Sequence, residues 1–473
     1  MNLAHEKTIL KFPELIGSDF LVETLNGQRV KYLNLDNAAT TPTFKAIYHK
    51  LEVLLCGYGS IHRGSGIKSQ ISTAIFEESI SIILRFLGVT PTDYAVIFTQ
   101  NTTSAINKLS RMLMLSTDDI IFVSEFEHSA NDLPWRKGAR IVRIPADSNG
   151  QLDLDYLDTS LKNEKCGRKL VAISGASNIT GALTPIHEIA VCAHAHNAHL
   201  MIDAAQLVAH REINLLGNQS AEQIDFISFS GHKMYAPFGG GVLIGRRDLI
   251  EKMVPDDIGG GSVDFVTHDT YDLAADLMKR STAGTSNVIG LVSIALACEI
   301  LKNQTGFNVI IEHEQAILDR AGQIIPRIKN METYCDLDYD AKKKCAILTF
   351  NLKGVHPALV AARLGHEFGI GVRQGAICQF LYVAKILGLG VDDVLVARKA
   401  VLSGQTDRMY GIVRASFGLE NNVDDVDRLA GALIEIGNTP EKNKNYVVNS
   451  DGELWPKGKP KIDVSNYFNL EEL

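Results

Sequence analysis

Short apolar runs alternate with segments of helical apolar spacing from about residue 30 to residue 250, and this alternation limits the fold more than any other feature. The predicted strands here are residues 32–35, 94–98, 119–124, 169–174, 198–203 and 225–230. Parallel strands need a crossover connection of a dozen or more residues, usually a helix, whereas tight turns join antiparallel strands. The alternation therefore predicts an α/β fold with a mainly parallel, helix-covered sheet in a large domain.

The pattern changes after about residue 304, where a charged helical segment is followed by strand-like spacing. This mixed order predicts a smaller α+β domain, because runs of strands and helices are no longer interleaved. A chain of 473 residues is also long for a single core. We expect a mixed helical lead-in over residues 1–30 that packs on the small domain, a large domain over 31–304, the small domain over 305–437, and an extended polar tail over 438–473.

Composition excludes several classes of function. A net charge of −8 and a pI near 6.0 give no electrostatic reason for binding nucleic acid or an anionic membrane, so small metabolites are the expected partners. The seven cysteines are scattered and lack CxxC spacing, which predicts a reducing cytoplasm, no disulfide framework and no metal site. The first residues lack the order of a signal peptide, and the longest apolar stretch, about residues 288–298, is too short to span a bilayer.

The segment 225–245 combines two apolar runs with a polar turn between them. Ser230, His232 and Lys233 lie almost side by side, and a glycine triplet leads into the second run. The two buried strands would hold the stem of Lys233 against the protein interior. A lysine in such a place has a lowered pKa and can act as an amine nucleophile that forms a Schiff base.

Other predicted strands also end in polar residues. Thr102 and Thr103 are candidate caps of a helix, and hydroxyls with free backbone N–H groups at a helix N-terminus suit a phosphate. His128 follows a strand at the edge where open α/β sheets bind ligands. Asp203 ends an apolar strand, which is costly unless the carboxylate meets a cation such as a protonated pyridine nitrogen. Together with Lys233, these groups match the needs of pyridoxal phosphate.

Ten short motifs extend this pattern through the chain: residues 35–42, 61–64, 101–107, 127–131, 177–181, 203–206, 229–233, 283–287, 372–375 and 414–416. In this order the sequence resembles class V aminotransferase-fold enzymes, most closely the group II cysteine desulfurases and selenocysteine lyases. The resemblance covers about residues 30–437. It implies the fold type I of pyridoxal-phosphate-dependent transferases and a homodimer with shared active sites.

The resemblance also assigns roles to residues. Lys233 would carry the cofactor and move protons, Asp203 would pair with the pyridine nitrogen, Gln206 would contact the phenolic oxygen, and His128 would stack on the ring. The phosphate would be bound by Thr102, Thr103, Ser230 and His232, joined by Thr285 of the partner subunit. Substrate would meet Asn178 and Arg414, which hold its carboxylate, with Arg373, Ala38 and His62 nearby.

Cys378 determines which reaction the resemblance implies. A cysteine at this spacing in the desulfurases takes sulfur from the substrate as a persulfide, which leaves alanine and calls for a sulfur-acceptor protein. Here the usual pair of histidines before this cysteine is replaced by Ala376 and Ile377, and Gln379 follows it. An apolar neighbour does not lower a thiol pKa. Three interpretations stay open: a cysteine desulfurase or selenocysteine lyase; a carbon–sulfur lyase, epimerase or aminotransferase that does not use Cys378; and a non-enzymatic binding protein.

Overall fold

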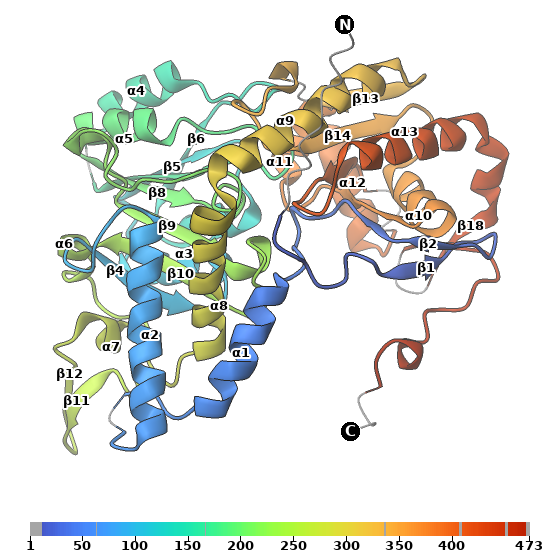
Figure 1. Cartoon of the computed structure of the whole chain (residues 1–473). Coiled ribbons are helices and arrows are strands. Elements are labelled where there is room, and N and C mark those ends of the chain that lie inside the picture. Colours follow the sequence, from blue (N-terminus) through green and yellow to red (C-terminus); the bar gives the residue numbers. More distant parts are fainter. Residues whose placement is uncertain are drawn as a thin grey trace, which may run out of the picture.

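The computed structural model describes residues 12–62, 64–165, 167–334, 337–405, 409–449 and 453–469. Two bodies are visible in Figure 1: one is built on a large sheet, and the other contains the later part of the chain.

The large sheet has seven strands in the order β4 (Tyr94–Thr99), β10 (Gly241–Arg246), β9 (Phe226–Ser230), β8 (Ala198–Asp203), β7 (Lys169–Ser174), β5 (Ile120–Ser124) and β6 (Arg140–Ile144). From β9 to β6 all neighbours are parallel, so the predicted α/β fold with a mainly parallel sheet is confirmed. β10 runs antiparallel to both β9 and β4. The ten residues between β9 and β10 are too few for a helical crossover, and they allow only an antiparallel return.

Alternate residues of the central strands enter two different cores. In β7, Val171 and Ile173 belong to the core that includes α2 (Ile67–Phe86), α5 (Ile186–Ala195) and α8 (Val288–Glu299). Leu170 and Ala172 belong to the core that includes α3 (Thr102–Met112). Successive strand side chains point to opposite faces, so covering both faces requires continuous apolar runs like those in the sequence.

α8 contains the apolar stretch that was expected to be too short to span a bilayer, and that expectation is wrong for the length of the helical segment. It continues as a π-helix, and the segment Val288–Thr305 is long and apolar enough to cross a membrane by length and composition alone. Of this segment, 61% is buried inside the fold, where α8 packs against α2. Burial in the core therefore accounts for its composition.

A second sheet forms its own core. Its order is β13 (Met331–Tyr334), β14 (Ile347–Leu352), β17 (Ile412–Ser416) and β16 (Arg373–Gly375), and all neighbours are antiparallel. The helices α9 (Phe307–Ile324), α10 (Pro357–Phe368) and α13 (Val423–Asn438) contribute to this core. Leu33 and Leu35 join it, because β3 (Leu33–Asn34) pairs in parallel with β15 (Ile370–Gly371).

The expected helical character of the lead-in is wrong for its described part. Residues 12–30 contain no helix, and β1 (Leu21–Glu23) pairs with β2 (Arg29–Lys31) as a hairpin that packs against the end of α10 through a bond from the Leu25 N–H to the His366 carbonyl. The tail also contains a hairpin, β18 (Tyr446–Val448) with β19 (Leu454–Pro456), and Trp455 packs edge-on against His366 at 4.6 Å between ring centroids. Neither segment has an apolar repeat long enough to distinguish a helix from a strand in the sequence.

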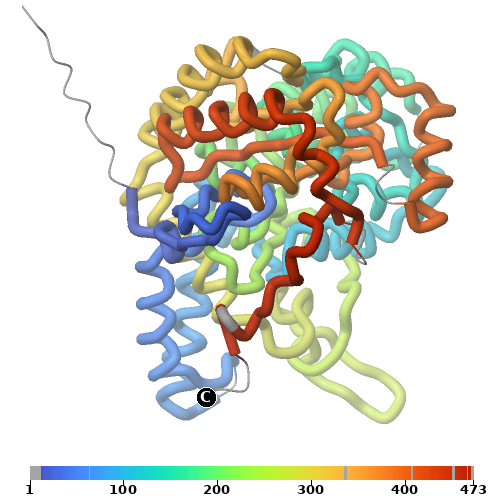
Figure 2. The backbone as a smooth tube through the Cα atoms, turned by 90° about the vertical axis from the view of Figure 1, so that its right-hand side faces the viewer, coloured from blue at the N-terminus to red at the C-terminus, as the bar shows by residue number. Residues whose placement is uncertain are grey.

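The remaining elements are α1 (Lys45–Gly57), α4 (Leu154–Asn163), α6 (Arg247–Ile250), α7 (Leu277–Ser281), α11 (Phe380–Ile386), α12 (Val391–Leu402), β11 (Val263–Val266) and β12 (Tyr271–Leu273). The β11–β12 hairpin projects away from the rest of the chain, and the C-terminal segment leaves the small body in an extended course (Figure 2).

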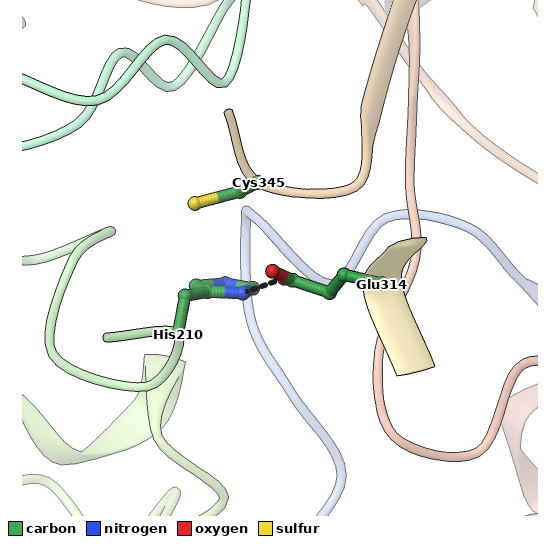
Figure 3. A group of neighbouring side chains, drawn as sticks. All are labelled: His210, Glu314 and Cys345. Carbon is green, nitrogen blue, oxygen red and sulfur yellow. Dashed lines mark hydrogen bonds and ion pairs between the residues drawn. The ribbon is translucent and has the colours of Figure 1, made fainter. Parts of the chain in front are cut away.

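A buried ion-pair cluster lies where α9 meets the large body (Figure 3). Glu314 of α9 bonds to His210 Nδ1 and to Arg211 Nη1, both at 2.5 Å. Arg211 also donates to the backbone carbonyls of Ala341 and Lys344. Although burial alone would raise it, the pKa of Glu314 is lowered by the charges of His210 and Arg211. The cluster therefore ties α9 to the loop after β8 and to the segment that precedes β14.

Cysteine spacing could not reveal that Cys345 lies beside this cluster. The possible ligand atoms of His210, Glu314 and Cys345 lie within 4.8 Å of one another. Arg211 already occupies one oxygen of Glu314, and its positive charge opposes a further cation at this place. We interpret the cluster as a structural junction.

Replacing Glu314 by leucine should destabilise the protein by about 3–5 kcal/mol, because a buried arginine would lose its counter-charge. The matched control is Arg320→Gln on the same helix, whose pair with Asp427 is about 40% exposed and should contribute less than about 1 kcal/mol. Urea denaturation measures both free energies of unfolding. Equal losses of unfolding free energy in the two variants would contradict the interpretation of the cluster as a structural junction.

Candidate active site

Thirteen of the predicted site residues line one cavity of about 550 Å³. They are Ala38, Thr102, Thr103, His128, Asn178, Asp203, Gln206, Ser230, His232, Lys233, Arg373, Cys378 and Arg414. The cavity lies at the carboxyl ends of β7, β8 and β9, where open α/β sheets hold their ligands. The second sheet closes it through β16 and β17, which carry the two arginines.

Lys233 sits in a tight turn directly after β9. A Cβ on Gly231 would lie 2.7 Å from the Ala236 carbonyl oxygen, so this turn requires glycine. Thr40 and Thr41 donate their hydroxyl groups to the carbonyl of His232. The run of small residues after β3 therefore buttresses the lysine turn from outside.

The electrostatic surroundings of Lys233 favour a neutral amine. Burial lowers its pKa to about 8, although the negative charge of Asp203 acts in the opposite direction. Burial likewise lowers the pKa of His232 to about 4, with a further contribution from Lys233. At pH 7 a pKa of about 8 leaves roughly one Lys233 in ten unprotonated and able to act as a nucleophile or base, far more than for an ordinary lysine.

Asp203 ends β8 and is 5% exposed. Burial raises the pKa of its carboxyl, while the N–H of Ala205 and the charge of Lys233 act against that rise. A carboxylate at this place is stabilised by a cation that enters the cavity. Gln206, in the following turn, donates to the Ala38 carbonyl at 2.6 Å, which connects this wall to the small-residue run.

The N-terminus of α3 forms the polar end of the cavity. Ser230 Oγ accepts the Thr102 N–H and bonds to Thr102 Oγ, both at 2.7 Å. Asn101 caps the helix by accepting the Ser104 N–H at 2.9 Å. A Cβ on Gly241 would lie 2.5 Å from the Cα of Asn101, so β10 can pass this helix start only with glycine. Hydroxyls gathered at a helix N-terminus suit an anion such as phosphate.

His128 follows β5 and is held by its neighbours. Its Nδ1 accepts the Ala130 N–H at 3.0 Å, and burial, with the charges of Lys233 and Arg414, lowers its pKa to about 4. The ring is therefore neutral, as stacking on a cationic heterocycle would favour.

Glu127 supports this turn and was missed by the sequence analysis. Its carboxyl group accepts hydrogen bonds from Ser124, from both the N–H and the hydroxyl of Ser174, and from Asn131. Burial raises its pKa to about 7, although these four donors favour the anion. A glutamate three residues after an apolar strand, inside the 127–131 motif, was the available signal.

Two arginines line the opposite wall of the cavity, and Asp36 pairs with both of them. Arg414 Nη2 donates to Asp36 Oδ1 at 2.8 Å, and Arg373 Nη2 lies 2.9 Å from Asp36 Oδ2. Arg414 Nη1 donates to the backbone carbonyl of Asn178 at 2.9 Å, and its buried Nε has no hydrogen-bond partner among the described residues. Arg373 and Arg414 are directly opposite in the β16–β17 register. Asp36 was not predicted as a site residue; its charge in an otherwise small and apolar run was the signal.

Cys378 is exposed and lies on the segment between β16 and α11. Its carbonyl accepts bonds from the N–H and the hydroxyl of Ser129, each at 2.9 Å. Ser129 follows His128, so the cysteine segment and the histidine turn are bonded directly to each other. Lys233, Arg414 and Cys378 thus line one space.

Two predicted site residues do not line this cavity. His62 packs edge-on against Phe76 of α2 and lines a second cavity of about 340 Å³. Gly284 and Ser286, on either side of the exposed Thr285, line that same second cavity. Within one chain, the structure brings His62 close to the Thr285 loop, and neither belongs to the cavity around Lys233.

The pH dependence of Lys233 can be measured through its reaction with a small aldehyde such as acetaldehyde, trapped by cyanoborohydride and located by peptide mapping. Only the unprotonated amine reacts, so labelling should rise with pH and reach half its maximum near pH 8. In Asp203→Asn the midpoint should fall, because a charge that favours the ammonium form is removed. A midpoint near that of an ordinary lysine, about 10.4, in both proteins would contradict this electrostatic account.

Comparison with known proteins identifies the family. The profile described as Aminotransferase class-V matches residues 33–429. A protein of Halalkalibacterium halodurans named "Probable cysteine desulfurase" is 31% identical over 438 residues, which cover 90% of this chain and 96% of the relative. A protein of Staphylococcus epidermidis with the same name is 33% identical over 87% of this chain and 93% of the relative.

A solved structure agrees with these relatives. The apo cysteine desulfurase of Thermococcus onnurineus NA1 is similar with a TM-score of 0.75 and 29% identity, over 86% of this chain and 95% of the other. The resemblance predicted from the motifs is thereby confirmed. The chain belongs to the class-V aminotransferase family of pyridoxal-phosphate-dependent enzymes.

Proposed function

We propose that this protein is a cysteine desulfurase, with selenocysteine as a chemically equivalent substrate, and that it forms alanine and a persulfide on Cys378. The observation that carries the proposal is the shared cavity: Lys233, Arg414 and Cys378 all line it. The relatives' names support the same reaction.

The residues of the cavity fit pyridoxal phosphate. Asp203 is a buried carboxylate that needs a cation, and Lys233 is an amine whose pKa is lowered to about 8. Because residue 241 is glycine, β10 passes the start of α3, beside Thr102 and Ser230, without a side chain in between. Lys233 would hold the aldehyde carbon, Asp203 the ring nitrogen, Gln206 the phenolic oxygen and His128 the ring face. Thr102, Thr103, Ser230 and His232 would hold the phosphate.

Different residues of the chain would bind the substrate and transfer its protons. Arg414 would bind the substrate carboxylate through its guanidinium, with Asn178 beside it, because a planar fork of N–H groups matches a carboxylate. Lys233 would take the proton from the substrate α-carbon and later return a proton to the β-carbon. The bound cofactor supplies an electron sink for the negative charge on the α-carbon.

Sulfur transfer balances without a further reactant. The Cys378 thiolate forms a bond to the substrate sulfur, and the bond between that sulfur and the β-carbon breaks. The electron pair of the broken bond goes to carbon, which gains a proton, so the products are alanine and an enzyme persulfide. A thiol-bearing acceptor must then remove the sulfur to regenerate Cys378, and a sulfur-acceptor protein is its proposed source.

We further propose a homodimer in the cytoplasm. His62 and the two neighbours of Thr285, Gly284 and Ser286, line a second cavity of their own chain. A partner subunit would bring Thr285 to the phosphate and His62 near the substrate of the first cavity. The exposed Cys56 and Cys378, both free thiols, suit a reducing compartment.

A carbon–sulfur lyase that releases pyruvate is the second candidate. It is favoured by Ala376 and Ile377, which stand before Cys378 in place of two histidines and leave the thiol without an acid–base neighbour in sequence. An epimerase or an aminotransferase would likewise leave Cys378 unused.

Incubation with L-cysteine separates these reactions. The desulfurase should release alanine and carry one extra sulfur atom on Cys378, detected by intact mass and peptide mapping. Cys378→Ala should lower alanine release by at least about 10²-fold, because covalent sulfur acceptance is lost while cofactor absorbance remains. The control is Cys56→Ala, which should keep full activity. Pyruvate and ammonia as products, or full activity of Cys378→Ala, would refute the proposal.

The two arginines provide a matched pair for substrate binding. Arg414→Lys should raise the KM for cysteine about 10- to 100-fold, because a buried bidentate donor is replaced by a point charge. Arg373→Lys should change KM by less than about fivefold, since the Arg373 side chain is 49% exposed. Steady-state kinetics at saturating cofactor measures both. A larger effect at Arg373 would reverse the assignment of the carboxylate site.

A further inference from the structure

The residue after Cys378 is a buried glutamine behind the cavity wall. Gln379 is 2% exposed and precedes α11. Its Nε2 donates to Asn178 Oδ1 at 2.5 Å. Its Oε1 is buried and has no hydrogen-bond partner among the described residues. An unpaired buried oxygen is costly, and the bond from Nε2 to Asn178 offsets part of the cost of burying this side chain.

The Asn178 amide is held at both ends, by the Ile377 carbonyl and by the Gln379 amide. Asn178 Nδ2 donates to the Ile377 carbonyl at 3.3 Å. A carbonyl can only accept, so Asn178 turns its nitrogen toward Ile377 and its oxygen toward Gln379. Gln379 must then present its nitrogen, and its oxygen is left without a donor. The Ile377 carbonyl, the Asn178 amide and the Gln379 amide therefore form one chain of hydrogen bonds.

This chain of hydrogen bonds determines which atom of the Asn178 amide faces the cavity. An amide nitrogen carries two hydrogens, and Ile377 takes one of them. Asn178 lines the cavity next to Arg414, so its second N–H is the donor left for a ligand there. Without Gln379, a half-turn of the Asn178 amide would present its oxygen instead, which repels a carboxylate.

The same bonds hold a strained segment. Ile377 and Cys378 have φ angles of +47° and +58°, a left-handed conformation that is unfavourable for side chains other than glycine and most of all for a β-branched one. Such a conformation persists only when surrounding contacts impose it. Asn178 holds the Ile377 carbonyl, and Ser129 holds the Cys378 carbonyl. The segment is thus clamped at two consecutive residues.

We propose that Gln379 is a positioning residue: it orients the Asn178 amide, and through that amide it sets both the donor offered to the substrate carboxylate and the conformation of the Cys378 segment. The identity of the substrate rests on the proposed function, whereas the positioning itself does not.

A double-mutant cycle tests whether Gln379 acts through Asn178. Gln379→Met keeps the length of the side chain and removes its donor, and it should lower kcat/KM for cysteine about tenfold. In an Asn178→Ala background the same change should have less than about a twofold effect, because the group that Gln379 orients is already missing. Equal effects in both backgrounds would overturn the proposal.

Gln379→Glu is a second, nearly isosteric variant. Its ionised carboxylate would face the Asn178 oxygen and repel it, so the activity of this variant should fall further behind wild type as pH rises and recover as the carboxyl is protonated. A ratio to wild type that stays constant across pH would count against orientation by hydrogen bonding.

Hydrogen exchange of the resting protein supplies a readout that does not need turnover. A peptide covering residues 375–379 should exchange several-fold faster in both Gln379→Met and Asn178→Ala than in wild type, because the clamp on Ile377 is weakened. A peptide from β14 should be unchanged. Unaltered exchange of 375–379 in both variants would overturn the proposal, whereas failure to release alanine from cysteine would refute only the proposed reaction.

Discussion

The attraction between Asp203 and Lys233 is the interaction on which the cavity depends. Both groups lie at the ends of neighbouring parallel strands, β8 and β9, and both are removed from bulk solvent. Burial destabilises the charged form of each, and their opposite charges offset part of that cost. A cationic ring bound between them would satisfy Asp203 and release Lys233 to act as a base. The pair is therefore adapted to a cofactor that carries both an aldehyde and a protonatable ring nitrogen.

On the opposite wall of the cavity the charged side chains are positive, and a carboxylate outside the cavity balances them. Arg414 and Arg373 bring two positive charges to adjacent strands of the second sheet, and Asp36 neutralises both. Because Asp36 belongs to the run that also buttresses the lysine turn, one short segment connects the cofactor side to the carboxylate side. The substrate would replace or share Asp36 as the counter-ion of Arg414, which makes the exposed Arg373 the more adaptable of the two.

The sequence predicted most of the cavity, because its motifs follow strands whose parallel order could be inferred. Ser230, Asp203 and Thr102 line one cavity for that reason. Asp36, Glu127 and Ser129 were missed, since their importance comes from partners that are far away in the chain or on a crossing segment. His62 and Thr285 come together at a separate cavity, which a single linear pattern cannot show. The lead-in was predicted as helical, yet pairing between β1 and β2 and packing on α10 gave its described part a hairpin.

The α/β alternation, the lysine after β9, the acid at the end of β8 and the cysteine after the Val-Arg-Gln-Gly motif could all be read from the chain, because they depend on residue type and local periodicity. How Cys378 is held could not be read from it and depends on tertiary contacts. The left-handed backbone at Ile377 and Cys378 is locally unfavourable. A local bond from the Gln379 N–H to the Ala376 carbonyl closes this turn, and Ser129 and Asn178, which lie 249 and 199 positions from their partners in the chain, bond to the carbonyls of Cys378 and Ile377. Local sequence preferences do not encode a conformation whose cost is offset by hydrogen bonds from distant segments.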